Sequence, residues 1–171
     1  AGSVPADVPY LAADPARIER WRERLAGLPG CKVGIAWQGN PASNADLGRS
    51  ARLAAMAPLS ALEGVRLVSL QKGAGTEQLW NFGPVEELGP GFDAGPDAFL
   101  DTAAVMQSLD LVVSVDSAPA HLAGALGRPV WIALKSVPDW RWMLGRDDTP
   151  WYPTARLFRQ DKAGDWDGVF R

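Results

Sequence analysis

Residues 111–127, LVVSVDSAPAHLAGALG, decide the fold, because a buried strand pattern here changes into a helix pattern within a few residues. Ser117 is a good N-cap, and the free amides and the dipole at such a helix tip favour an anion. Pro119 removes one amide donor, whereas His121 follows about one turn into the helix and can point back to the same anion. The stretch therefore predicts a binding site for a diphosphate (the diphosphate seat). The alternative is that Asp116 and Ser117 only cap the helix and that His121 packs or faces solvent.

The rest of the chain alternates between short apolar runs and helical periodicity. Strands are expected at residues 31–37, 65–70, 85–88 (weak), 111–115, 129–134 and 156–158. Helices are expected after the N-cap Asp14, around 56–62, over 97–109 and 120–126, with a short segment at 165–170. The alternation predicts an α/β class: a Rossmann-like, three-layer domain with a mostly parallel sheet. Ligands of such sheets bind at the carboxyl ends of the strands.

We expect two parts in the chain. Residues 1–30 read as a linker arm and a helix that leads into the domain, and residues 31–171 as the domain itself. The loop 38–50 is longer than most connections between a strand and a helix, which indicates that it has a role in binding or catalysis.

Within this loop, Arg49 and Ser50 precede the next helix and can bind phosphate. Gly39 and Asn40 also belong to the candidate site, although both suit a turn with positive φ.

Two further segments follow predicted strands. Gln71 and Lys72 come directly after the second strand, where a lysine can bring a point charge to a phosphate; the alternative is an ordinary surface lysine. The region 139–156 interleaves tryptophan and arginine, which can stack on bases or sugars. The favoured interpretation is structural: an arginine–aromatic cluster that fixes the tail to the domain.

Composition excludes several classes of function. The net charge of −3 gives no basic field for nucleic acid or an anionic membrane, and no apolar run approaches the roughly 20 residues of a membrane span. With one cysteine, Cys31, and one histidine, no intrachain disulfide and no typical zinc site can form, and a reducing, cytoplasmic location is expected. The sequence lacks the glycine motifs of dinucleotide dehydrogenases and P-loop NTPases, and the serine motif of α/β-hydrolases.

Several blocks, in this order along the chain, resemble the C-terminal glycosyltransferase region of bacterial tetratricopeptide-repeat proteins. This region is similar to the heptosyltransferases (glycosyltransferase family 9) and, more distantly, to O-linked N-acetylglucosamine transferases. The resemblance extends from about Val4 to Arg171 and is carried by KVGIAWQGNP (32–41), RS (49–50), SLQKG (69–73), DTA (101–103), LDLVVSVDS (109–117), AHLAGALGRPVW (120–131), DWRW (139–142) and WYPTARLFRQ (151–160).

The resemblance implies the C-terminal half of a GT-B fold, in which two Rossmann-like domains face a cleft. In such enzymes the C-terminal domain holds the nucleotide of the donor, and the N-terminal domain supplies much of the acceptor site. The implied diphosphate-binding residues are Gly39, Asn40, Arg49, Ser50, Gln71, Lys72, Asp116, Ser117, Ala118 and His121. Heptosyltransferases commonly have Asp-Thr-Gly at the positions that correspond to 116–118. Because the Cβ of Ala118 narrows the space in which the backbone approaches a phosphate, the identity of the donor sugar stays open.

The expected function is donor binding in a glycosyltransferase that uses a nucleoside diphosphate sugar as substrate, with no cofactor, no metal and no catalytic residue assigned. The chain is expected to be inactive as an isolated half, because an N-terminal acceptor domain and tetratricopeptide repeats are missing from it. Two alternatives remain: a non-catalytic protein-interaction domain of the same fold, and a nucleotide-sugar epimerase-like domain.

Overall fold

The computed structural model describes residue 4 and residues 7–171, so positions 1–3, 5 and 6 of the predicted linker arm lie outside the described residues. Within these limits, six strands form one sheet in the spatial order β3-β2-β1-β4-β5-β6, and every neighbouring pair is parallel. The predicted α/β class with a parallel sheet is confirmed. The strands are β1 (Cys31–Ala36), β2 (Val65–Ser69), β3 (Val85–Glu86), β4 (Leu111–Val115), β5 (Val130–Leu134) and β6 (Ala155–Arg159).

The chain changes direction across the sheet at β1. From β1 it moves outward through β2 to β3, and it then returns to place β4 on the other side of β1. Ile35 is paired with Ser69 of β2 on one side and with Val113 of β4 on the other. The loops after β1 and β4 therefore leave toward opposite faces of the sheet, which opens a crevice between the carboxyl ends of these strands.

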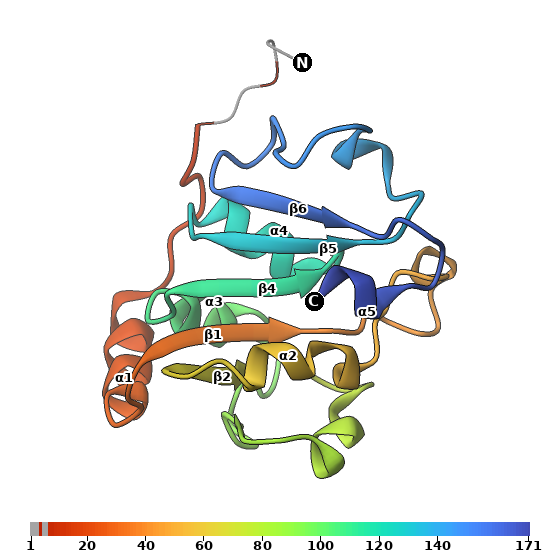
Figure 1. Ribbon diagram of the computed structural model, residues 1–171. Helices are drawn as coiled ribbons and strands as arrows, with labels where there is room; N and C mark the ends of the chain where they lie inside the picture. Colours follow the sequence, from red (N-terminus) through yellow and green to blue (C-terminus); the bar gives the residue numbers. More distant parts are fainter. Residues whose placement is uncertain (1–3, 5–6) are drawn as a thin grey trace.

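Helices cover both faces of the sheet (Figure 1). In the view of Figure 1, α3 and α4 lie behind the strands and α2 and α5 in front of them. Each face has its own cluster of buried side chains, and neighbouring residues of β4 divide between them, Val112 behind and Val113 in front. The helices are α1 (Pro15–Leu25), α2 (Ala57–Ser60), α3 (Leu100–Met106), α4 (Ala118–Ala125) and α5 (Trp166–Val169), with 3-10 turns η1 (Asn44–Asp46), η2 (Leu53–Met56), η3 (Thr76–Asn81) and η4 (Trp140–Trp142).

Two predicted helices are shorter than expected. The helix predicted over 97–109 is α3, which begins only at Leu100 because Phe99 adopts a left-handed backbone with φ 69°. The helix predicted around 56–62 is the 3-10 turn η2 followed by the single turn α2. Pro58 has no N–H with which to bond back to η2, so the two turns do not merge.

A buried carboxylate joins α1 to α3. Asp101, with 3% of its surface exposed, accepts hydrogen bonds at Oδ1 from Trp21 Nε1 (2.9 Å), Arg17 Nη1 (2.9 Å) and Arg20 Nη2 (2.5 Å). Burial acts to raise the pKa of Asp101, but the hydrogen bonds from Trp21 and Arg17 outweigh it, and the pKa lies below its usual value. The ionised carboxylate thus anchors α1 to α3.

Replacing Asp101 with asparagine is expected to lower the free energy of unfolding by about 3 kcal/mol at neutral pH, because Arg17 loses a buried partner. A depressed folded-state pKa stabilises the protein above the unfolded-state value, about 3.9, and this stabilisation is lost as the pH falls through the folded-state pKa. Urea unfolding at pH 7 and at pH 3 checks this. The gap in the free energy of unfolding between wild type and Asp101→Asn should be smaller at pH 3. An equal gap at both pH values would contradict the assignment.

Candidate functional site

A cleft of about 420 Å³ opens at the carboxyl edge of the sheet, between the loops that follow β1, β2 and β4. Its volume lies in the usual range of small-molecule sites. The residues that line it are Ala36, Gln38, Gly39, Asn40, Pro41, Arg49, Leu70, Gln71, Lys72, Ala74, Phe99, Ser117, Ala118 and Pro119. Seven of the ten residues predicted from sequence are among them: Gly39, Asn40, Arg49, Gln71, Lys72, Ser117 and Ala118.

The loop after β1 folds back on itself around Ser50. The Ser50 hydroxyl donates to the Asp46 carboxylate (2.7 Å to Oδ1) and accepts from the Gly39 N–H (2.9 Å). Arg49 lies on the cleft with Nε 3.5 Å from Asp46 Oδ1, and a Cβ on Gly39 would lie 2.6 Å from Arg49 Nη2. Ser50 therefore closes the loop rather than lining the cleft, and glycine at position 39 leaves room for the guanidinium.

Gln71 joins the loops after β1 and β2. Its Oε1 accepts from the N–H groups of Trp37 and Gln38 (both 3.1 Å), and its Nε2 donates to the carbonyl oxygens of Gln38 (2.9 Å) and Ala74 (2.8 Å). Both ends of the amide are thus bonded to backbone. Gln71 lies on the cleft as predicted, and what its side chain does in the structure is to fix the two loops beside each other.

The tip of α4 forms one wall of the cleft. Ser117 is its N-cap residue, and Ser117, Ala118 and Pro119 all line the cleft. The Ser117 hydroxyl lies 3.2 Å from the hydroxyl of Ser114 instead of bonding to a helix amide. The amide of Ala118, the first of the helix, has no acceptor within α4, so the positive end of the helix dipole faces the cleft.

Lys72 supplies a positive charge to the same cleft. Its ammonium donates to the backbone carbonyls of Phe92 (3.1 Å) and Asp93. Both acceptors are neutral, and among the described residues no carboxylate forms an ion pair with Lys72. The charge is therefore available to an anion.

Two of the predicted residues, Asp116 and His121, lie beside the cleft rather than along it. His121 Nδ1 is 3.0 Å from the hydroxyl of Tyr152, and its Nε2 is 3.6 Å from Asp116 Oδ1. The His121 ring also stacks on Trp142, with centroids 5.3 Å apart. Burial raises the pKa of Tyr152 well above its usual value, so this phenol stays neutral and can bond to the imidazole.

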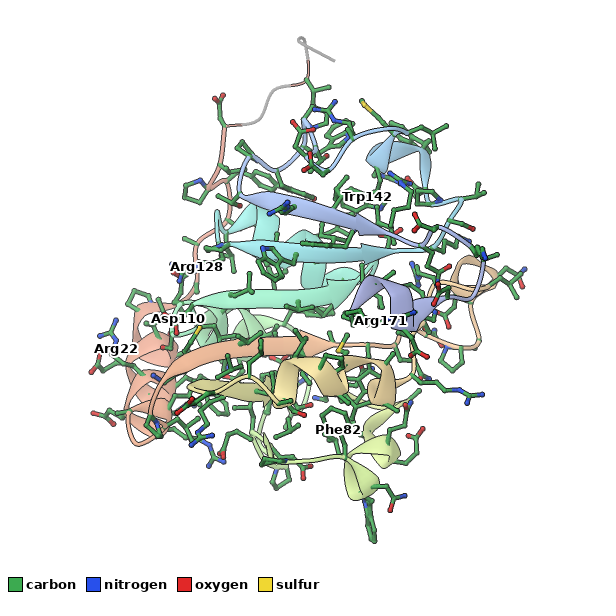
Figure 2. The ribbon with its side chains drawn as sticks, viewed as in Figure 1. Arg22, Phe82, Asp110, Arg128, Trp142 and Arg171 are labelled. Atoms are coloured by element: carbon green, nitrogen blue, oxygen red, sulfur yellow. The ribbon has the colours of Figure 1, made fainter. Side chains whose placement is uncertain are left out.

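The same cluster explains one part of the tryptophan-rich tail. Trp142 is fully buried and lies by β6, at the top of the view in Figure 2. Tyr152 packs directly over Gly124 of α4, where a Cβ would lie 2.3 Å from the phenol ring. The structural interpretation of the tail therefore applies to Trp142 and Tyr152, which hold it against α4.

Phe99 is a cleft residue that the sequence did not reveal. The helical pattern places it inside a helix, together with Ala103 and Met106. In the structure it precedes α3 in a left-handed conformation, and 45% of its surface is exposed. Such a backbone costs an ordinary side chain about 1–2 kcal/mol. The sequence pattern does not predict this position. The nearby Gly95 and Pro96 are the signals that the segment is irregular.

The part of the chain that the structure describes contains no group of three or more histidine, cysteine, aspartate or glutamate side chains able to hold a metal ion. In that same part, none of the helices has both the length and the apolar character needed to cross a membrane.

The chain is similar to several known proteins. The family model of glycosyltransferase family 9 (heptosyltransferase) matches residues 92–134, which include β4, the tip of α4 and β5. Protein FlbA of Caulobacter vibrioides is 35% identical over 166 residues, covering 92% of this chain and 27% of FlbA. The chain thus spans about a quarter of that relative.

Two solved structures share the fold. The E. coli ADP-heptose LPS heptosyltransferase II superimposes with a TM-score of 0.63 at 16% identity, over 98% of this chain and 53% of that one. A glycosyl transferase family 9 structure from Veillonella parvula gives 0.62 at 15% identity, over 88% of this chain and 42% of that one. These two structures share the α/β fold of this chain, and the chain spans about half of each of them.

Replacing Gly124 with alanine is expected to lower the free energy of unfolding by at least about 1 kcal/mol. The displacement of the Tyr152 ring outweighs the gain of about 1 kcal/mol in helix propensity. Urea unfolding measures the loss. Gly27→Ala is the matched control, since its Cβ would meet no atom within 4 Å. Equal stabilities of the two variants would show that Tyr152 does not pack on α4 as described.

Proposed function

We propose that residues 31–171 form the donor-binding half of a GT-B glycosyltransferase. The whole enzyme would transfer a sugar from a nucleoside diphosphate sugar to a protein or saccharide acceptor. One observation carries the proposal: the tip of α4, Lys72 and Arg49 line a single cleft at the point where the strand order reverses. A helix tip and two cations on one cleft suit an anion with two phosphates.

The proposed chemistry concerns the leaving group. Sugar transfer releases a nucleoside diphosphate, whose negative charge grows in the transition state. The Ala118 amide, the Ser117 hydroxyl, Lys72 and Arg49 would stabilise that charge from positions fixed before the reaction. Charges and dipoles of the protein could perform this task without a coenzyme.

The remaining predicted residues would act from behind the cleft. Ser50 and Gln71 hold the loops that carry Gly39, Asn40 and Arg49. Asp116 and His121 border the tip of α4, where the imidazole lies 3.6 Å from the carboxylate. We propose that these four side chains support the diphosphate seat. No general base is assigned, and we expect the base and the acceptor site to come from a second domain, so this chain alone would not transfer sugar.

A second candidate function rests on the exposed part of the tail. Trp140 is 68% exposed, Arg141 lies over its ring at 4.9 Å, and Val137 and Leu144 are exposed nearby in the sequence. Tryptophan and arginine are enriched in protein–protein contacts. A non-catalytic interaction domain would use this surface. A pull-down that is lost in Trp140→Ser, from a protein that binds no nucleotide, would favour this second function.

Isothermal titration calorimetry with UDP, ADP, GDP and CDP tests the main proposal, with the corresponding monophosphates as controls. We expect one diphosphate to bind clearly more tightly than its monophosphate, because the helix tip and the two cations surround both phosphates. If the folded domain binds none of them at millimolar concentration, or binds both forms equally, the diphosphate seat is wrong.

The variants Lys72→Met and Arg49→Met are each expected to raise the Kd for the best diphosphate about tenfold, the usual size of one charge-assisted contact. Arg66→Met is the matched control, because it removes the same charge from an exposed position in the amino-terminal half of β2. Equal effects of all three variants would indicate that only the net charge matters. An unchanged Kd in both cleft variants would remove these cations from the site.

A further inference from the structure

We propose that Asp93 and Asp101 are positioning residues for Lys72, and that through them α1 controls where the cleft holds its lysine charge. The inference rests on the proposed function for its meaning, since it assigns Lys72 to an anionic ligand. Its structural basis is a continuous chain of hydrogen bonds from α1 to the Lys72 ammonium.

The first link is a carbonyl cradle around the ammonium. Lys72 Nζ donates to the carbonyl oxygens of two consecutive residues, Phe92 and Asp93. Both residues are buried, so the turn that presents these carbonyls is part of the core. A lysine ammonium has three N–H donors, and this arrangement leaves one for a ligand. The cradle thus fixes the ammonium without neutralising it.

The second link locks the turn at residue 93 to the start of α3. Asp93 Oδ1 accepts from the N–H groups of Asp101 (2.8 Å) and Thr102 (3.3 Å), and its Oδ2 accepts from the Thr102 hydroxyl. In return, the Asp93 N–H donates to Asp101 Oδ2 (3.1 Å). Asp93 also has a left-handed backbone with φ 44°, which persists only where its surroundings determine it. The reciprocal bonds supply that constraint.

The third link connects α3 to α1. While Asp101 Oδ2 holds the turn, its Oδ1 accepts from Arg17, Arg20 and Trp21 of α1. One buried carboxylate thus joins the helix that leads into the domain to the turn that holds Lys72. Any displacement of α1 must move Asp101, and therefore the carbonyls that hold the ammonium.

The physical benefit is preorganisation. A free lysine has four rotatable bonds and loses much rotamer freedom when it binds a phosphate. The carbonyl cradle imposes that cost during folding, so little is left to lose at the moment of binding. Loosening the turn is expected to weaken nucleotide binding even though Asp93 and Asp101 are not among the residues that line the cleft.

A double-mutant cycle on the whole chain tests the inference. Thr102→Val and Asp101→Asn are each expected to raise the Kd for a nucleoside diphosphate about three- to tenfold, and to have almost no effect in a Lys72→Met background. Asp110→Asn is the matched control. Asp110 accepts from the Lys32 N–H (2.7 Å) at the amino edge of the sheet, far from the cleft (Figure 2), and its loss should leave the Kd unchanged. An equal loss of affinity in both backgrounds would overturn the role.

A second readout does not depend on nucleotide binding. Acetylation of Lys72 by an amine-reactive reagent, followed by mass spectrometry, should become several-fold faster in Thr102→Val, because an ammonium released from the cradle is more accessible. Thr102→Val keeps the shape of the side chain, so the change tests the lost hydrogen bond to Asp93, and the variant is measured where circular dichroism shows that it is folded. An unchanged rate would overturn the inference even if nucleotide binds. Faster acetylation in a protein that binds no nucleotide would leave the positioning intact and refute only the proposed function.

Discussion

The neighbouring carboxyl ends of β1 and β4 are the constraint on which the site depends. Because the chain continues from β1 toward one edge of the sheet and from β4 toward the other, the connections that follow these two strands diverge. The loop that ends at Arg49 and the tip of α4 can therefore face each other across an open cleft. The order of the strands therefore allows hydrogen-bond donors from separate loops to converge on one ligand, whichever side chains these loops carry.

Polar side chains then make this edge rigid. Gln71 uses both ends of its amide to hold two loops, Ser50 closes the loop after β1, and Asp93 fixes the turn beneath Lys72. Each of these groups bonds to backbone amides, so the loops gain partners that no sheet or helix provides for them. Loops held in this way suit the stabilisation of a leaving group that we propose for this cleft.

The sequence was sufficient for the fold and for much of the cleft. The apolar runs predicted all six strands. Because ligands of parallel sheets bind at the carboxyl ends of the strands, the loops at residues 39, 72 and 117 could be predicted as parts of the cleft. It could not reveal Phe99, since a left-handed residue depends on tertiary context. Nor could it show that Gln71 bonds to backbone, or that His121 pairs with Tyr152 from a distant segment. Local patterns identify which loops matter, whereas the partner of each side chain is decided by packing.

We propose that the phosphates of a nucleotide lie between the loop after β1 and the tip of α4. The most direct measurement is a ¹H–¹⁵N NMR titration of the chain with the nucleoside diphosphate that binds it best. The account predicts the largest shift changes at the amides of Gly39, Asn40 and Ala118, which line the cleft. Changes confined to the exposed segment around Trp140, or to the amino edge of the sheet near Asp110, would contradict it.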